Sequence, residues 1–139
     1  MDCSILIVDD DAFFRRMLVK AMLALECEFT LCVDGRECLE VVNSEVFDYD
    51  MVLMDVHMPE MLGSEVTTII RTLINNSLQK APIIAMTSDS SWCDQARCET
   101  AGFSGFLKKP ADTRALHDTL SQALPMWLNA PESELAKTA

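Results

Sequence analysis

Charged and hydroxyl side chains follow several short apolar segments in this chain. Asp55 comes directly after residues 51–54, which have the length and composition of a buried parallel strand. The other candidates follow three further apolar runs: Asp9, Asp10 and Asp11 after residues 4–8, Thr87 and Ser88 after 82–86, and Lys108 and Lys109 after 104–107. In open α/β sheets the carboxyl ends of the strands form the edge where ligands bind. These residues are therefore predicted to share one site.

The residue types at this edge suit phosphoryl chemistry. Carboxylates held together repel one another, so a folded domain keeps them ionised by supplying a cation, and oxygen ligands of this kind suit Mg²⁺. With that cation, Asp55 can act as a nucleophile towards phosphorus, because aspartyl phosphates are established covalent intermediates. Thr87 can donate a hydrogen bond to one phosphoryl oxygen, and either Lys108 or Lys109 can pair with another. The set predicts a metal-assisted phosphoryl acceptor.

Each of these residues also has a simpler interpretation. An aspartate after a strand, such as Asp55, often only caps a turn. Three successive aspartates before a helix commonly supply a cap and solvated charge, a Thr-Ser pair commonly forms a turn, and a Lys-Pro pair commonly marks a loop. Their joint arrival at the ends of four strands favours the functional interpretation.

Alternating strands and helices are predicted to position these residues. Apolar runs predict strands over 4–8, 28–32, 51–55, 82–86 and 104–108. Helical spacing predicts helices over 12–25, from Asp34 onward with Leu39, Val42 and Val46 inward, around Val66, Ile69, Ile70 and Leu73, over 91–101 before Gly102, and from Asp112 with Leu116, Leu120, Ala123 and Leu124 on one side. Residues 75–80 are predicted to be a polar connection. Strands that alternate with helices in this way form a parallel sheet covered on both faces.

The composition fits one globular domain and argues against two classes of partner. The chain has 22 acidic and 11 basic residues, a net charge of −11, which repels nucleic acid and anionic membranes. No apolar stretch has the roughly 18 residues of a membrane span, and no basic segment precedes the first apolar run, so we expect a cytoplasmic protein. The six cysteines contain no Cys-x-x-Cys pair and are expected to be reduced, mostly buried thiols.

Four segments of the sequence resemble one known family. These segments are Ile5 to Asp11, Leu53 to Gly63, Pro82 to Ser88 and Ala101 to Pro110. In order and spacing they are similar to the receiver domain of two-component response regulators, which act in phosphorelays. The resemblance covers about residues 3–124 and implies an α/β, flavodoxin-like doubly wound (βα)5 fold with a five-stranded parallel sheet in the order 2-1-3-4-5. We expect a receiver domain over residues 1–124 and a flexible C-terminal tail over 125–139.

The resemblance implies the chemistry of the phosphoryl site. Asp55 would accept a phosphoryl group from a phosphohistidine. Asp9 and Asp10 would hold Mg²⁺ together with Asp55, and the main-chain carbonyl of His57 would complete the protein ligands. Asp11 would lie outside this metal site and serve as a helix cap or an edge charge.

The resemblance also implies the residues that respond to phosphorylation. Thr87 would be the switch hydroxyl, and Lys109, directly before Pro110, would be the lysine of the motif, with the Lys109-Pro110 bond cis. Phe106 matches the switch aromatic, or else is an ordinary core residue. In similar domains these groups reshape the face of the fourth helix, fifth strand and fifth helix, which is also the expected homodimer surface.

The resemblance extends to partners and to variable positions near the site. His57 and Asp89 match positions that tune how long the phosphoryl group survives. The motifs are most similar to receivers of hybrid histidine kinases, so the chain is either a free-standing regulator or one domain of a longer protein. Its expected partner is a histidine kinase or a histidine phosphotransfer protein, and it would catalyse only its own phosphorylation and dephosphorylation.

Three other interpretations stay open. A phosphatase with an aspartate nucleophile would carry an Asp-x-Asp motif, whereas His57 occupies the place of the second aspartate here. A flavodoxin-like redox module is disfavoured because aspartates after the first strand would repel a flavin phosphate. A pseudo-receiver would only bind proteins.

Trp92, Trp127 and Leu128 could cover a dimer face or fold back on the same chain.

Overall fold

A parallel sheet forms the centre of the molecule. The structure is a computed structural model, and it describes residues 3–44, 48–73 and 76–123. Five strands run in the order β2-β1-β3-β4-β5, and all neighbouring pairs are parallel. The strands are β1 (Ser4–Val8), β2 (Glu28–Cys32), β3 (Met51–Asp55), β4 (Ile83–Thr87) and β5 (Gly105–Lys108). This topology confirms the predicted flavodoxin-like, doubly wound arrangement.

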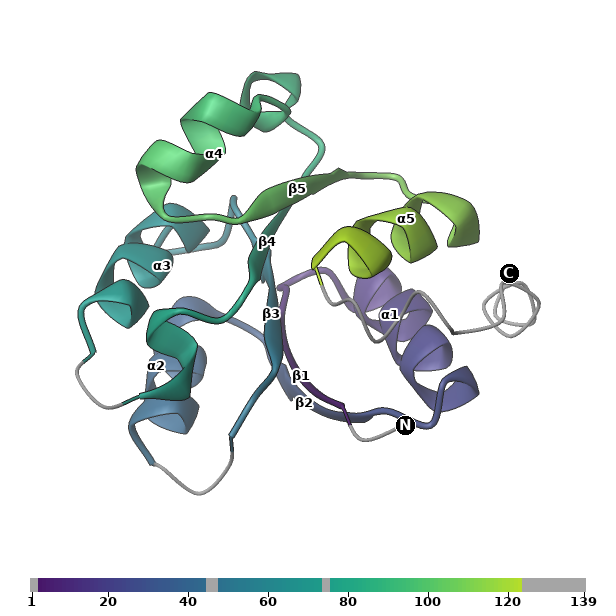
Figure 1. Cartoon of the computed structure of the whole chain (residues 1–139), viewed down its shortest axis with the longest axis horizontal. Coiled ribbons are helices and arrows are strands. Elements are labelled where there is room, and N and C mark those ends of the chain that lie inside the picture. The colour runs from purple at the N-terminus through teal and green to yellow at the C-terminus, as the bar shows by residue number, and fades with distance from the viewer. Residues whose placement is uncertain (1–2, 45–47, 74–75, 124–139) are drawn as a thin grey trace.

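Helices cover both faces of the sheet (Figure 1). They are α1 (Ala12–Ala24), α2 (Gly35–Asn43), α3 (Gly63–Arg71), α4 (Gln95–Ala101) and α5 (Thr113–Ala123), with short 3₁₀ helices η1 (Ser77–Gln79) and η2 (Ser90–Trp92). Helices α1 and α5 lie on one face, and α2, α3 and α4 lie on the other (Figure 1). None of the helices in the described ranges has the length and apolar character needed to cross a bilayer.

The sheet separates two apolar layers because successive side chains of a strand point to opposite faces. In β1, Ile5 and Ile7 pack with α1 and α5, whereas Leu6 and Val8 pack with α2, α3 and α4. The same alternation holds in β3 and β4, whose residues are all buried. Burial on both faces explains why these strands are continuously apolar in the sequence.

Aspartates cap the starts of several helices, and a glycine ends one of them. Asp11 accepts a hydrogen bond from the Phe13 amide and caps α1. Asp34 caps α2 through the Glu37 amide, and Asp112 accepts from the Ala115 amide at the start of α5. Gly102 ends α4 in the left-handed conformation with φ of 99°. Such caps satisfy backbone groups that have no partner within the helix.

Three local predictions differ from the structure. The helix predicted over 91–101 is divided into η2 and a shorter α4, because Asp89 caps the first turn and Asp94 caps the second. The connection predicted over 75–80 contains η1, which buries Leu78. Ile69, predicted to lie on the inward stripe of α3, is exposed. The predicted positions of Val46, Leu124, Trp127, Leu128 and the tail lie outside the described residues.

Candidate functional site

The strand register brings the predicted site residues to one edge of the sheet. Val8 of β1 pairs with Met54 of β3, and Asp9 and Asp55 are the next residues on the two strands, so they lie side by side. Thr87 is one residue beyond the β4 partner of Asp55. Lys108 pairs with Thr87 on β5, and Lys109 follows at the same edge. Neighbouring strand ends therefore deliver carboxylate, hydroxyl and ammonium groups together.

A cleft of about 360 Å³ opens at this edge. Asp10, Asp55, Thr87 and Lys109 are among the residues that line it. A larger hollow of about 520 Å³ lies elsewhere and includes Phe106 in its uncharged lining. The smaller cleft is the candidate site for chemistry, because it alone of these two contains charged groups.

Three carboxylates meet in the cleft. One oxygen from each of Asp9, Asp10 and Asp55 lies within 4.8 Å of the others. Asp9 is fully buried and Asp55 is 5% exposed, whereas Asp10 is open to solvent. Within the described ranges this is the one cluster of three or more acidic, cysteine or histidine ligands; the six cysteines form no disulfide, and none of them belongs to the cluster. The donor set fits a hard divalent cation such as Mg²⁺.

Lys109 supplies positive charge to these carboxylates. Its Nζ lies 2.7 Å from Asp9 Oδ2 and 3.6 Å from Asp55 Oδ1. The same Nζ lies 4.5 Å from the centroid of the Phe14 ring, on the apolar side of the cleft. Lys108 is exposed, so the structure distinguishes two lysines that strand spacing alone could not. The Lys109-Pro110 bond is cis, as the resemblance implied.

The environment of Asp55 opposes its ionisation. Burial raises the pKa of the Asp55 carboxyl from 3.8 to about 8; a hydrogen bond with Asp10 and the charge of Asp9 act in the same direction, while Lys109 lowers it. The single ammonium group therefore does not offset the burial and repulsion of these carboxylates. An added divalent cation would favour the ionised form, which agrees with the fit of the donor set.

Thr87 lies in the cleft, and Phe106 does not. The Thr87 side chain is 1% exposed, and its Oγ1 accepts a hydrogen bond of 2.9 Å from the Asp89 amide. Phe106 is half-buried on β5 and packs against the layer formed with α2, α3 and α4. It lines the larger hollow, so the two predicted switch residues occupy different cavities.

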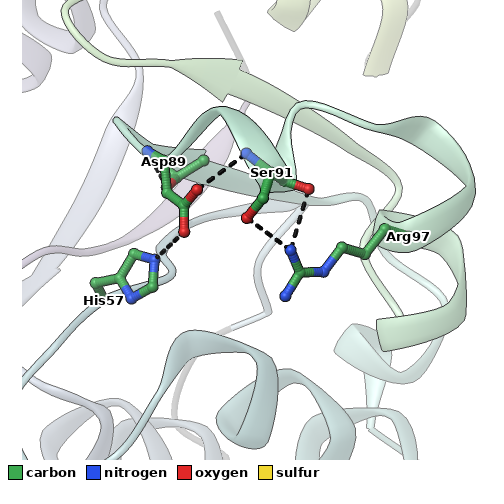
Figure 2. Close-up of polar contacts among 5 residues, drawn as sticks. His57, Asp89, Ser91 and Arg97 are labelled. Atoms are coloured by element: carbon green, nitrogen blue, oxygen red, sulfur yellow. Dashed lines mark hydrogen bonds and ion pairs between the residues drawn. The ribbon is translucent and has the colours of Figure 1, made fainter.

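The His57 ring spans the mouth of the site towards Asp89. His57 Nε2 lies 3.2 Å from Asp89 Oδ2, which joins the loop after β3 to the turn after β4 (Figure 2). The His57 side chain is 51% exposed. Its position two residues after Asp55 predicted proximity, but the partner and the direction of the ring follow from the folded loops.

Two residues important for this geometry were not identified from the sequence as part of the site. A Cβ atom at Gly63 would overlap the carbonyl oxygen of Asp55, so glycine lets the start of α3 approach the strand end. The Gly63 amide also donates to the Val56 carbonyl at 2.8 Å. Arg97 is connected to Asp89 through Ser91 (Figure 2). Gly63, at the end of the loop after Asp55, can be seen in the sequence and could have indicated a close backbone approach, whereas nothing in the spacing indicated the Arg97 contact.

The sequence matches a known family and curated relatives. The family model for the response regulator receiver domain matches residues 5–121. Hybrid signal transduction histidine kinase B of Dictyostelium discoideum is 34% identical over 134 residues, covering 90% of this chain and 7% of that protein. The chain thus spans only a small part of that relative.

Solved structures share the fold. Chemotaxis protein CheY4 of Vibrio cholerae has a TM-score of 0.78 and 27% identity, covering 89% of this chain and 100% of that one. The receiver domain of sensor histidine kinase PA1611 from Pseudomonas aeruginosa has a TM-score of 0.75 and 29% identity, covering 90% and 99%. That second structure has a magnesium ion coordinated in its active site cleft.

Proposed function

Because the chain belongs to the response regulator receiver domain family, we propose that it accepts a phosphoryl group on Asp55 and switches a protein-binding face. The observation that carries this proposal is the placement of Asp55 within a cluster of three carboxylates, with Lys109 Nζ 3.6 Å from its Oδ1. This arrangement supplies a nucleophile and a cation at the same end of the sheet. The expected donor is a phosphohistidine on a histidine kinase or a histidine phosphotransfer protein.

Asp9, Asp10 and Asp55 are proposed to hold Mg²⁺ with the main-chain carbonyl of His57. The carboxylate cluster and the raised pKa of Asp55 support this assignment. When bound, the metal would offset negative charge on the carboxylates and on the phosphoryl oxygens.

Asp55 acts in its ionised form in the proposed reaction. A carboxylate oxygen of Asp55 attacks phosphorus, an O–P bond forms, and the N–P bond of the phosphohistidine breaks. The departing imidazole takes up a proton from solvent and leaves as a neutral histidine. Lys109 pairs with a phosphoryl oxygen, and the Thr87 hydroxyl donates a hydrogen bond to another. Both side chains line the same cleft as Asp55.

The protein-binding face is proposed to lie over α4, β5 and α5. Phe106 belongs to β5 and borders a hollow that also includes Gln95 of α4 and Thr119 of α5. A change in the packing of Phe106 would therefore alter a surface shared by these three elements. This face is the proposed surface for a homodimer or another protein, within a cytoplasmic regulator or a hybrid kinase parent; nucleic acid and membrane are not proposed as partners.

The phosphoacceptor proposal is favoured over an aspartate-nucleophile phosphatase by His57. That side chain contacts Asp89 at the mouth of the cleft, and an imidazole replaces the second carboxylate expected of such a phosphatase. A protein-binding pseudo-receiver remains the other alternative, and phosphorylation distinguishes it. We propose no enzymatic activity beyond phosphorylation and dephosphorylation of the chain itself.

Intact-protein mass measures the proposed reaction directly. The protein is incubated with Mg²⁺ and acetyl phosphate, in parallel with samples containing EDTA, and a phosphorylated histidine phosphotransfer protein serves as a second donor. We expect one phosphoryl adduct, absent from Asp55→Asn and strongly reduced in Asp10→Asn. Asp11→Ser is the matched control, because serine can also cap α1. No adduct with either donor would contradict the proposal and favour the pseudo-receiver.

A further inference from the structure

Two residues that border the phosphoryl site converge on Asp89. The Asp89 amide donates to Thr87 Oγ1 at 2.9 Å, and Asp89 Oδ2 lies 3.2 Å from His57 Nε2. Thr87 lines the cleft from β4, and His57 lines it from the loop after β3. Asp89 therefore contacts both sides of the site without lying among the carboxylates.

The second oxygen of Asp89 continues this connection away from the site. Asp89 Oδ1 accepts from the Ser91 amide at 2.9 Å and caps η2 (Figure 2). Ser91 then accepts two hydrogen bonds from Arg97 Nη1, 3.1 Å at its carbonyl and 2.7 Å at its Oγ. The same planar carboxylate of Asp89 contacts both His57 and Ser91. A movement of this carboxylate relative to His57 therefore also changes its contact with Ser91.

Trp92 lies at the far end of this set of contacts. The guanidinium carbon of Arg97 is 3.9 Å from the centroid of the Trp92 ring, a cation–π arrangement. Trp92 is 8% exposed and meets the Phe103 ring edge-on at 5.8 Å. The Cys98 thiol donates to the Trp92 carbonyl at 3.2 Å. Trp92 thus joins the Arg97 contact to the apolar layer beneath α4.

We propose that Asp89 is a positioning residue that transmits occupancy of the Asp55 site to Arg97 and Trp92. This inference rests on the proposed function. A phosphoryl group that accepts a hydrogen bond from the Thr87 hydroxyl engages the same oxygen that accepts from the Asp89 amide. Mg²⁺ bound through the main-chain carbonyl of His57 would constrain this residue, and the His57 ring contacts Asp89. The first event acts on the Asp89 amide and the second on the Asp89 carboxylate, and that carboxylate caps the turn leading to Arg97.

The linkage is first tested in the unphosphorylated protein. Trp127→Phe leaves Trp92 as the single tryptophan, and quenching of its fluorescence by acrylamide measures its exposure. Asp89→Ala and Thr87→Val are each expected to raise the quenching constant about twofold, because they remove contacts that hold η2. Asp89→Asn retains an oxygen for the Ser91 amide and should stay close to the parent. Glu99→Ala serves as the control, because it removes an acidic side chain on α4 whose hydrogen-bond partner is Gln95.

The second measurement follows Trp92 after phosphorylation, with the adduct quantified by mass in the same samples. We expect the parent to change its quenching constant on forming the adduct, and Asp89→Ala to form the adduct with no further change. Equal quenching of the parent, Asp89→Ala and Thr87→Val before phosphorylation would overturn the linkage. An unchanged phosphorylation response in Asp89→Ala would also overturn it. If no adduct forms in the parent, the proposed function fails, and the unphosphorylated variants still decide whether Asp89 links Thr87 to Trp92.

Discussion

Asp55 combines burial with the proposed role of an ionised nucleophile. Its pKa is raised from 3.8 to about 8 mainly by burial, then by Asp10 and Asp9. The folded state therefore binds this proton more tightly than the unfolded state does. The resulting stabilisation is fully present below pH 3.8 and is lost as the pH rises through about 8.

We predict that the metal-free protein loses stability between pH 5 and pH 8 relative to Asp55→Asn. Each pKa unit corresponds to about 1.4 kcal/mol, and we expect a relative loss of roughly 3 kcal/mol in the free energy of unfolding. Urea denaturation in EDTA at both pH values measures it. Mg²⁺ should reduce the loss, since it favours the ionised carboxyl. Parallel pH dependence of the two proteins in EDTA would contradict the raised pKa.

Lys109 gives a second prediction at the same scale. Lys109→Ala removes the ammonium 2.7 Å from the fully buried Asp9 and should lower the free energy of unfolding in EDTA by about 3 kcal/mol. Lys108→Ala, at the exposed neighbouring position, should change it by less than about 0.5 kcal/mol. Urea denaturation compares the two variants. Similar losses in both variants would show that the Lys109 ammonium does not stabilise the buried Asp9 carboxylate.

The charged residues of the candidate site could be predicted because their types, and their positions after apolar runs, can be read directly from the sequence. It identified Asp11 as a cap candidate but could not choose among the three aspartates by spacing, and it chose Lys109 over Lys108 only by resemblance. The contact between His57 and Asp89 depends on how two separate loops approach one another. Such contacts follow from side-chain direction in the folded protein, which apolar periodicity does not encode.

At the scale of elements, the start of α3 must approach the end of β3. Gly63→Ala would place a methyl group against the Asp55 carbonyl, and backbone at that position cannot yield as a flexible side chain can. We predict a loss of about 1–3 kcal/mol in the free energy of unfolding and weaker stabilisation by Mg²⁺, because Asp55 is displaced. Thermal and urea denaturation with and without Mg²⁺ measure both effects.

Gly105→Ala is the matched control for Gly63→Ala. A Cβ there would have its nearest neighbour at 3.7 Å, an ordinary contact distance. This variant should keep the Mg²⁺-dependent increase in stability. If both alanine variants respond to Mg²⁺ as the parent does, the close approach at Gly63 is not required for the site.

The division between η2 and α4 shows why element boundaries were harder to predict than elements. Trp92, Cys93 and Ala96 formed a thin apolar stripe that fitted one helix. Asp89 and Asp94 each cap a separate turn, and side-chain caps of this kind compete with continuous helical hydrogen bonding. By contrast, β1 and β3 were placed correctly because every residue of their apolar runs except the first or last is fully buried.

At the scale of the whole molecule, the sheet connects the two apolar layers. Neighbouring residues of β1, such as Ile5 and Leu6, belong to opposite layers. Disruption of one layer therefore exposes strands whose other side chains form the second layer. A single domain of this size usually unfolds in one cooperative transition. The layers should therefore share one free energy of unfolding.

We predict that Leu18→Ala, in the layer formed by α1 and α5, destabilises the opposite layer equally. Leu18 is fully buried, and its truncation should lower the free energy of unfolding by about 3 kcal/mol. In the Trp127→Phe background, Trp92 fluorescence reports the layer beneath α4, and circular dichroism reports all helices. Both signals should shift to the same lower urea midpoint. A Trp92 transition that stays at the parent midpoint, while the circular dichroism transition moves, would show that the sheet does not couple the layers. Leu23→Ala, at an exposed position of the same helix, should leave both midpoints near those of the parent.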